Sequence, residues 1–197
     1  MNPFGVILKR LLMPDSTASE IVDCLEQLRD PKFAPPMMQY LATEFGENPK
    51  ITRVLIRAAG ETSYRPLHDL LAKRLLDNPT SEFAFDLLDA LGKTGRPDYA
   101  GIVLMFLGDE YGLPIQTTAV CSLGLLGSAL AIPALLEVIR VKKHRLRELA
   151  IEGLRRILAQ QIVNKPLEAY LIAYSPKVRE RIRAAIGIRR PRRTIAT

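Results

Sequence analysis

The sequence predicts an all-α protein, a right-handed α-solenoid of about five to six antiparallel helix pairs with a period of about 32 residues. Three observations support this fold class. Clusters of small residues recur at that period, prolines stand at matching positions between them, and apolar residues follow a helical spacing throughout. Self-similarity of this kind is typical of repeat architectures, in which each helix pair buries its apolar face only against its neighbours.

The recurrence is clearest at the end of the first helix of each predicted pair. In chain order the series reads Leu28-Arg29, Ala58-Ala59-Gly60, Ala90-Leu91-Gly92, Ser122-Leu123-Gly124, Leu154-Arg155 and Ile186-Gly187. Successive members are 31 or 32 residues apart. A glycine just after the last periodic residue suits a left-handed C-terminal cap, so we expect the glycines of this series to end their helices.

Prolines divide the chain in the same way, because proline is tolerated in the first turn of a helix. Asn48 precedes Pro49 and Ser175 precedes Pro176, and these two residues are the expected N-caps. Thr17-Ala18-Ser19-Glu20 has the pattern of a capping box. The predicted first helices cover residues 17–29, 49–60, 80–92, 114–124, 144–160 and 176–187. The predicted second helices cover residues 35–45, 66–77, 97–108, 130–142 and 166–173.

We expect one domain over residues 1–188 and a basic, flexible tail over residues 189–197. The charge is distributed unevenly along this chain. Residues 1–137 carry 12 Lys and Arg against 17 Asp and Glu, a net of −5, whereas residues 138–197 carry 16 against 4, a net of +12. The overall charge of +7 therefore belongs to the last third, and this asymmetry is the strongest functional clue in the sequence.

Four segments carry a family resemblance: Leu91–Gly95, Leu123–Gly127, Ala131–Leu136 and Leu146–Leu154. Over about residues 80–160 they resemble the short HEAT-like repeats first associated with phycobilisome lyases. The resemblance implies stacked helix pairs whose second helices line the partner-binding face. Ankyrin repeats match only at Pro66–Leu70, and tetratricopeptide repeats fit the period without their Trp and Tyr positions, so HEAT-like repeats are preferred.

No catalytic motif stands out in the chain. The two histidines, His68 and His144, are expected on the surface, and neither has a cysteine or serine partner at a known spacing. Asp86 and Asp89 are explained as a solvated helix edge. The paired His-Glu motifs, cysteine clusters and tryptophans that enzymes on HEAT-like scaffolds use are absent from the sequence. We therefore expect no self-contained enzyme, no cofactor and no metal site.

The predicted helix over residues 97–108 supplies a candidate apolar groove, because it has no charge from Tyr99 to Leu107. The groove would consist of Tyr99, Ile102 and Phe106, together with Val138 from the next second helix and Val141 as an extension. A helix that is apolar all round is either buried or presents an exposed patch. Burial between neighbouring repeats is the preferred interpretation, and a partner groove is the alternative.

The basic end supplies a second candidate surface, for an anionic partner. Its residues are Arg140, Lys142, Lys143, Arg145, Arg147, Arg179, Arg183, Arg189, Arg190, Arg192 and Arg193. Arginine forks suit phosphates and carboxylates, so nucleic acid or an acidic protein would be attracted. Aromatic residues that could stack on bases are not interleaved with these charges, and a solvated face that caps the array explains them equally well.

Cys24 and Cys121 lie three periods apart, too far for a disulfide if the repeats stack about 10 Å apart. Both are expected as small core residues in a reducing compartment. The charge-free run over residues 111–136 is long enough to cross a bilayer, but its polar residues and its repeat register argue against a span. We therefore expect a cytoplasmic protein without a membrane span.

Three functions are compatible with these patterns. The preferred one is a non-catalytic helical-repeat scaffold or adaptor that binds another protein. The alternatives are a nucleic-acid-binding module without base specificity, which would use the basic C-terminal third, and a HEAT-like lyase or chaperone subunit that acts with a partner chain. The sequence identifies neither the partner nor the oligomeric state.

Overall fold

The computed structural model describes residues 2–141, 145–160 and 165–187, with the backbone alone at Arg145, Lys165 and Pro166. Within these ranges there are twelve α-helices, four 3-10 helices and no strand, so the predicted all-α class is confirmed. The α-helices are α1 (Pro3–Leu12), α2 (Ala18–Leu28), α3 (Ala34–Thr43), α4 (Pro49–Gly60), α5 (Arg65–Asp77), α6 (Ala84–Lys93), α7 (Ala100–Leu104), α8 (Leu113–Leu126), α9 (Ile132–Val141), α10 (Arg145–Gln160), α11 (Lys165–Leu171) and α12 (Pro176–Ile186). The 3-10 helices are η1 (Pro31–Phe33), η2 (Pro97–Tyr99), η3 (Met105–Leu107) and η4 (Ala129–Ala131).

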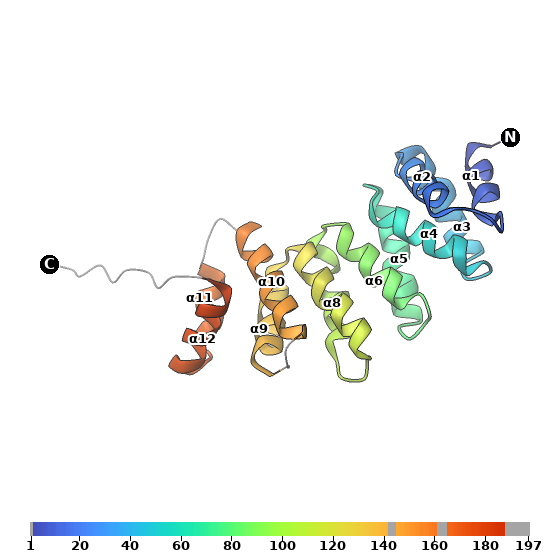
Figure 1. Cartoon of the computed structure of the whole chain (residues 1–197). Helices are drawn as coiled ribbons and strands as arrows, with labels where there is room; N and C mark the ends of the chain where they lie inside the picture. The colour runs from blue at the N-terminus through green and yellow to red at the C-terminus, as the bar shows by residue number, and fades with distance from the viewer. Residues whose placement is uncertain (1, 142–144, 161–164, 188–197) are drawn as a thin grey trace.

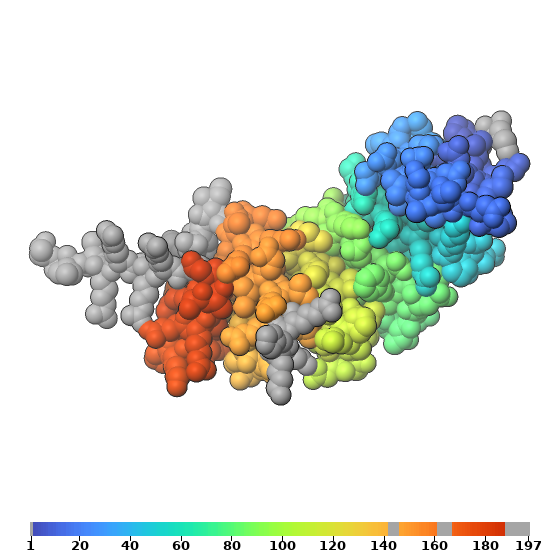
Figure 2. Space-filling model, in the orientation of Figure 1, coloured from blue at the N-terminus to red at the C-terminus, as the bar shows by residue number. Residues whose placement is uncertain are grey.

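The helices follow one another along an elongated body, with α1 at one end and α12 at the other (Figure 1). The surface colours pass from blue to red in chain order without mixing, so each segment lies beside its sequence neighbours (Figure 2). We call α2, α4, α6, α8, α10 and α12 the first-helix layer, and each of these helices packs against the next. The second-helix layer comprises α3, α5, α7, α9 and α11.

Apolar side chains between the two layers form a core that extends along the whole body. Its members come from nearly every helix, and the fully buried ones include Leu28, Met37, Leu55, Leu71, Leu87, Leu123, Leu135 and Leu154. A helix pair of this length buries too little apolar surface to fold alone, so contacts between neighbouring pairs supply much of the stability. In the described part of the chain, none of the helices has the combination of length and apolar character needed to cross a bilayer.

Helix starts follow the predicted caps in most places. The Asn48 side chain accepts from the backbone N–H of Ile51 at 3.1 Å, and Thr17 and Glu20 form the reciprocal bonds of a capping box. Ser175 occupies the N-cap position of α12, but its side chain makes no capping hydrogen bond. The helix expected from residue 80 begins instead at Ala84, because a turn occupies the preceding residues.

Two parts of the helix pattern differ from expectation. The short segment before the first predicted pair is itself a helix, α1, which is capped by the Asn2 side chain. The predicted helix over residues 97–108 is divided into η2, α7 and η3, and it ends where Gly108 adopts an extended conformation with φ −60° and ψ 151°. Its continuous α-helical part covers only five residues.

Gly60, Gly92 and Gly124 do not form the predicted left-handed caps: Gly60 is the last residue of α4, as expected, whereas Gly92 and Gly124 lie inside α6 and α8. A Cβ added to Gly92 would lie 2.7 Å from the Cβ of Ser122, and one added to Gly124 would lie 2.6 Å from the Cα of Gly153. These glycines therefore allow close approach of consecutive first helices, since any side chain would clash with the neighbour. Left-handed conformations occur instead at Gly46, Gly95, Gly127 and Gly187.

Candidate functional site

Because η3 ends at Leu107, part of α9 has no helix beside it on the side that faces α7 and η3, within the described residues. α7 packs against η4, at the start of the next second-helix unit, whereas α9 continues to Val141. The loop after η3 is held in place, because the Gln116 amide donates to the carbonyl of Gly108 at 2.7 Å. The Tyr111 ring also packs on Phe106, with ring centroids 4.8 Å apart. An ordered loop therefore faces α9 where a longer helix would have covered it.

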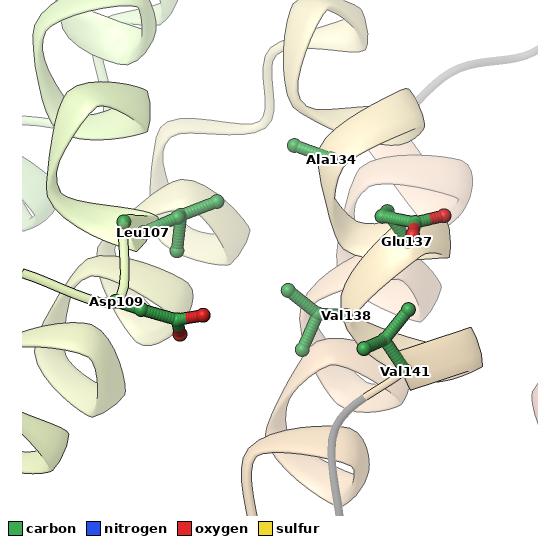
Figure 3. A pocket seen from close by; sticks show the side chains of 7 residues that line it. Leu107, Asp109, Ala134, Glu137, Val138 and Val141 are labelled. Atoms are coloured by element: carbon green, nitrogen blue, oxygen red, sulfur yellow. The ribbon is translucent and has the colours of Figure 1, made fainter.

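A pocket of about 270 Å³ occupies this position. On α9 it is lined by Ala134, Val138 and Val141, which recur at the spacing of one helical face. Leu107 and Asp109 face this helix across the pocket (Figure 3). Val141 is 53% exposed, although it is aliphatic. We call this the apolar pocket; Gly108 and Glu137 complete its lining.

Most of the predicted apolar groove lies in the core. Tyr99 and Phe106 are 5% and 1% exposed, and Ile102 is half-buried. The Tyr99 hydroxyl donates to the Asp69 carboxylate at 2.6 Å, while burial, together with that carboxylate, raises the pKa of Tyr99 to about 12. A groove at Tyr99 and Phe106 is therefore closed, because both rings are buried among the neighbouring helices. Val138 lines an open pocket.

His68 is also placed differently from the prediction of a surface position. The side chain is buried on α5, and its Nε2 lies 3.1 Å from the carbonyl oxygen of Thr62. Its Nδ1 is buried without a hydrogen-bond partner, and burial lowers the pKa of the imidazole. The turn between α4 and α5 folds back over this side chain through Thr62, a contact that the helical spacing of α5 does not reveal. His144 lies outside the described residues.

The predicted basic surface is only partly available to a partner. Arg140 pairs with Glu137, with nitrogen–oxygen distances of 2.9 and 2.5 Å. Arg179 donates to the carbonyls of Tyr174 and Ile172, and Arg183 pairs with Glu168 at 2.7 Å. Arg147 is exposed. The remaining predicted members lie outside the described residues or have side chains outside them: Lys142, Lys143, Arg145, Arg189, Arg190, Arg192 and Arg193.

The other chemically reactive residues do not assemble into a centre. Asp86 is half-buried beside Arg53, at 3.3 Å, and Asp89 pairs with Lys93 at 2.7 Å. Burial raises the pKa of Asp86, although the neighbouring arginine opposes the shift. Across the described ranges, no three His, Cys, Asp or Glu side chains come together as metal ligands would.

The two cysteines occupy different environments. Cys24 is buried in α2 as expected, and burial raises the pKa of its thiol. The expectation of a core position is wrong for Cys121, which is exposed because it lies on the face of α8 opposite the one that packs on its neighbours. No disulfide joins the two cysteines.

No protein-family model matches this chain, and no curated protein matches its sequence. The candidate site is therefore interpreted from its own geometry. The sequence-based list missed Leu107 and Ala134 of the apolar pocket, and it missed Arg181, which lines a second pocket with Arg140 and Arg147. The spacing of Ala134, Val138 and Val141 on one face was a usable signal for the first pocket.

Proposed function

We propose that this chain is a HEAT-like α-solenoid that acts as a non-catalytic scaffold for another protein, with the apolar pocket as its docking point. The repeat assignment is supported by contacts that join residues about one period apart. Arg29 pairs with Glu61, Ser122 donates to the carbonyl of Leu88, and Arg155 donates to the carbonyl of Ile186. Such contacts tie each helix pair to the next, as a stacked repeat requires.

The observation that carries the proposal is the apolar pocket beside α9, in which the aliphatic Val141 is 53% exposed. Exposed apolar surface costs free energy in water, and a cleft that gathers several aliphatic side chains is a common place for a partner to bind. Asp109 and Glu137 border this cleft, and Glu137 is paired with Arg140. The occupant that fits is a segment of another protein with one large aliphatic side chain.

The nucleic-acid alternative has less support. Binding without base specificity depends on several cations that meet successive phosphates. Arg179 and Arg183 belong to the predicted surface, but both are engaged by groups of this chain. A cytoplasmic location, as the sequence predicts, belongs to the proposal as well.

Site-specific photocrosslinking in cells tests the docking point. A photoreactive residue at Val141 is expected to capture a discrete protein, and the same residue at Leu130 serves as the control, since Leu130 is 59% exposed in the same second-helix unit. The captured protein is then purified and its affinity for the wild-type chain measured. Equal capture from both positions would contradict the assignment.

Substitutions then separate docking from folding. Val141→Asp should weaken binding of the purified partner by about tenfold or more, the loss expected when one aliphatic contact is removed and a charge is placed in the cleft. Leu130→Asp introduces the same charge on an exposed aliphatic position and should leave the affinity unchanged. Circular dichroism should show equal helix content in both variants. Unchanged affinity in Val141→Asp would remove the pocket from the proposal.

A further inference from the structure

A second pocket lies where α9, α10 and α12 meet, and each of these helices contributes one arginine to it. Arg140, Arg147 and Arg181 line a space of about 100 Å³ together with Ile139, Val178 and Ile182. Ile139 and Ile182 are buried, and Val178 is half-buried, so an aliphatic floor lies beneath the charged groups. We call this the arginine pocket.

Other arginines at this end of the molecule are engaged by neighbouring groups. Arg155 and Arg179 donate to backbone carbonyls, while Arg156 and Arg183 pair with carboxylates. Arg147 and Arg181 differ, because neither forms a hydrogen bond or an ion pair with any residue in the described part of the chain. Two guanidinium groups that bind no other described residue therefore line the same small pocket.

Arg147 and Arg181 are both exposed, so the pocket presents two solvent-accessible positive charges above its aliphatic floor. The third arginine, Arg140, is compensated by Glu137, which lines the apolar pocket on the other side of α9. Glu148 and Glu180 are adjacent in sequence to Arg147 and Arg181, but adjacent helical residues point in different directions.

We propose that the arginine pocket binds an acidic peptide segment in which an aliphatic side chain stands between two carboxylates. The guanidinium groups of Arg147 and Arg181 would each donate hydrogen bonds to one carboxylate, which is the geometry that arginine forks prefer. The aliphatic side chain of the peptide would cover the floor formed by Ile139, Val178 and Ile182.

The aliphatic floor decides between a peptide and a nucleic acid. A phosphate backbone offers no apolar group to cover Ile139 and Ile182, and none of the described lining residues is an aromatic on which a base could stack. Contacts along a phosphate backbone depend on a row of cations, and the described lining of this pocket offers two available arginines. A short acidic peptide uses both the charges and the apolar surface.

Fluorescence anisotropy with the full-length chain tests this proposal. A labelled peptide with the core Glu-Leu-Glu should bind, and the matched peptide with the core Gln-Leu-Gln should bind about tenfold or more weakly, because it lacks the charges that strengthen these hydrogen bonds. Affinity for the acidic peptide should fall as salt is added. Equal binding of the two peptides would overturn the proposal.

A double substitution identifies the residues that are responsible. Arg147→Gln with Arg181→Gln should reduce affinity for the acidic peptide by at least tenfold. The control is Arg156→Gln with Lys177→Gln, which changes the same two helices and the net charge by the same amount, and it should change the affinity by less than about twofold, since exposed charges at a distance are screened. Equal losses of affinity in both double variants would mean that only the net charge of the protein matters, and the proposed site would be wrong.

Two further comparisons exclude the competing explanations. A single-stranded oligonucleotide is tested as a competitor of the labelled peptide. If it displaces that peptide at a lower concentration than the unlabelled peptide does, and if the displacement depends on Arg147 and Arg181, the proposed peptide ligand is wrong and nucleic acid is the better ligand. The Val141→Ser variant alters the apolar pocket without adding charge and should bind the acidic peptide as the wild type does. The arginine pocket and the docking point can therefore fail independently of each other.

Discussion

The two layers of helices are held together in different ways. Consecutive first helices touch through small residues, so that Gly60 approaches Ala90, Gly92 approaches Ser122 and Gly124 approaches Gly153. Consecutive second helices are joined by longer side chains, such as Tyr99, which reaches Asp69 on α5. Backbones that touch leave no room for a partner, whereas side chains that bridge wider gaps leave pockets between them.

Arg74 illustrates the second kind of joint. This residue of α5 donates to the carbonyls of Leu41 and Ala42 at the end of α3, and its guanidinium lies over the Phe45 ring at 5.0 Å. The side chain therefore completes a helix end that would otherwise have unpaired carbonyls. The first-helix layer therefore determines how the helix pairs stack, whereas the second-helix layer can vary its surface. The apolar pocket lies in the layer that varies.

The largest effect is expected where the first helices touch. Gly124→Ala should lower the free energy of unfolding by about 3 kcal/mol, because the new Cβ would lie 2.6 Å from the Cα of Gly153 and only backbone could move away. Urea denaturation followed by circular dichroism measures this loss. A change below about 1 kcal/mol would show that the helices separate easily, and the distinction between the two layers would fail.

A smaller effect is expected at the last first-helix contact. Arg155 donates from Nε to the carbonyl of Ile186 at 3.0 Å and from a terminal nitrogen to that of Ala185 at 2.8 Å. Arg155→Met should destabilise α12 by about 1.5 kcal/mol, since charge-assisted bonds to two helix-end carbonyls are lost. Hydrogen exchange of the α12 amides would detect this change.

The neighbouring residue provides the control for this measurement. Arg156 forms an exposed ion pair with Glu152 four residues earlier on the same helix. Exposed pairs of this kind contribute little, so Arg156→Met should change protection of α12 by less than about 0.5 kcal/mol. Equal effects at the two positions would mean that the contact with the α12 carbonyls does not stabilise this end.

The positions of the helices could be predicted because their signals are local. Pro49 and Pro176, for example, mark helix starts where the structure has them. The role of the glycines could not be predicted, because one residue type serves both left-handed caps and close helix contacts. Gly92 and Gly187 belong to the same series, yet only Gly187 has a left-handed conformation. The difference depends on whether a neighbouring helix lies against the glycine. The residues around one glycine do not predict that tertiary contact.

The candidate pockets were harder to predict than the helices for a related reason. From sequence alone, an arginine on a helix is interpreted as a solvated charge, whether or not its guanidinium is bound by a group of another helix or turn. Arg179 and Arg183 have the spacing of one helical face, and both turn out to bind groups of α11 and the turn after it. Arg181 was not selected, although it flanks Val178 and Ile182 in the arginine pocket. Only tertiary contacts distinguish engaged arginines from available ones.

A moderate, pH-dependent effect is expected at His68, a buried titratable residue of the second-helix layer. Its pKa is lowered in the folded state by burial, so the unfolded chain binds the proton more tightly. Stability should therefore be complete above the unfolded pKa of about 6.5 and should decrease below it, by up to about 1.4 kcal/mol per pH unit. The positive charge of Arg96 also lowers the pKa of His68 and therefore adds to this loss of stability, whereas the negative charge of Asp69 raises that pKa.

The variant His68→Gln separates this residue from the other groups that titrate. Glutamine can still donate to the carbonyl of Thr62, but it binds no proton in this range. The slope of unfolding free energy against pH, measured between about pH 5.5 and pH 7.5, should be smaller in the variant than in the wild type. Identical slopes would mean that His68 takes up its proton without loss of the buried contact.

The smallest effect is expected at Gly101 of α7, and its sign is opposite to that at Gly124. A Cβ added at Gly101 would meet only the Leu130 Cδ2, at 4.0 Å. Gly101→Ala should therefore raise the free energy of unfolding by about 0.5 kcal/mol, because alanine loses less backbone entropy in a helix. The same denaturation experiment measures both glycines. Destabilisation at Gly101 would show that the second helices approach as closely as the first, and the space that the proposed partner needs would not exist.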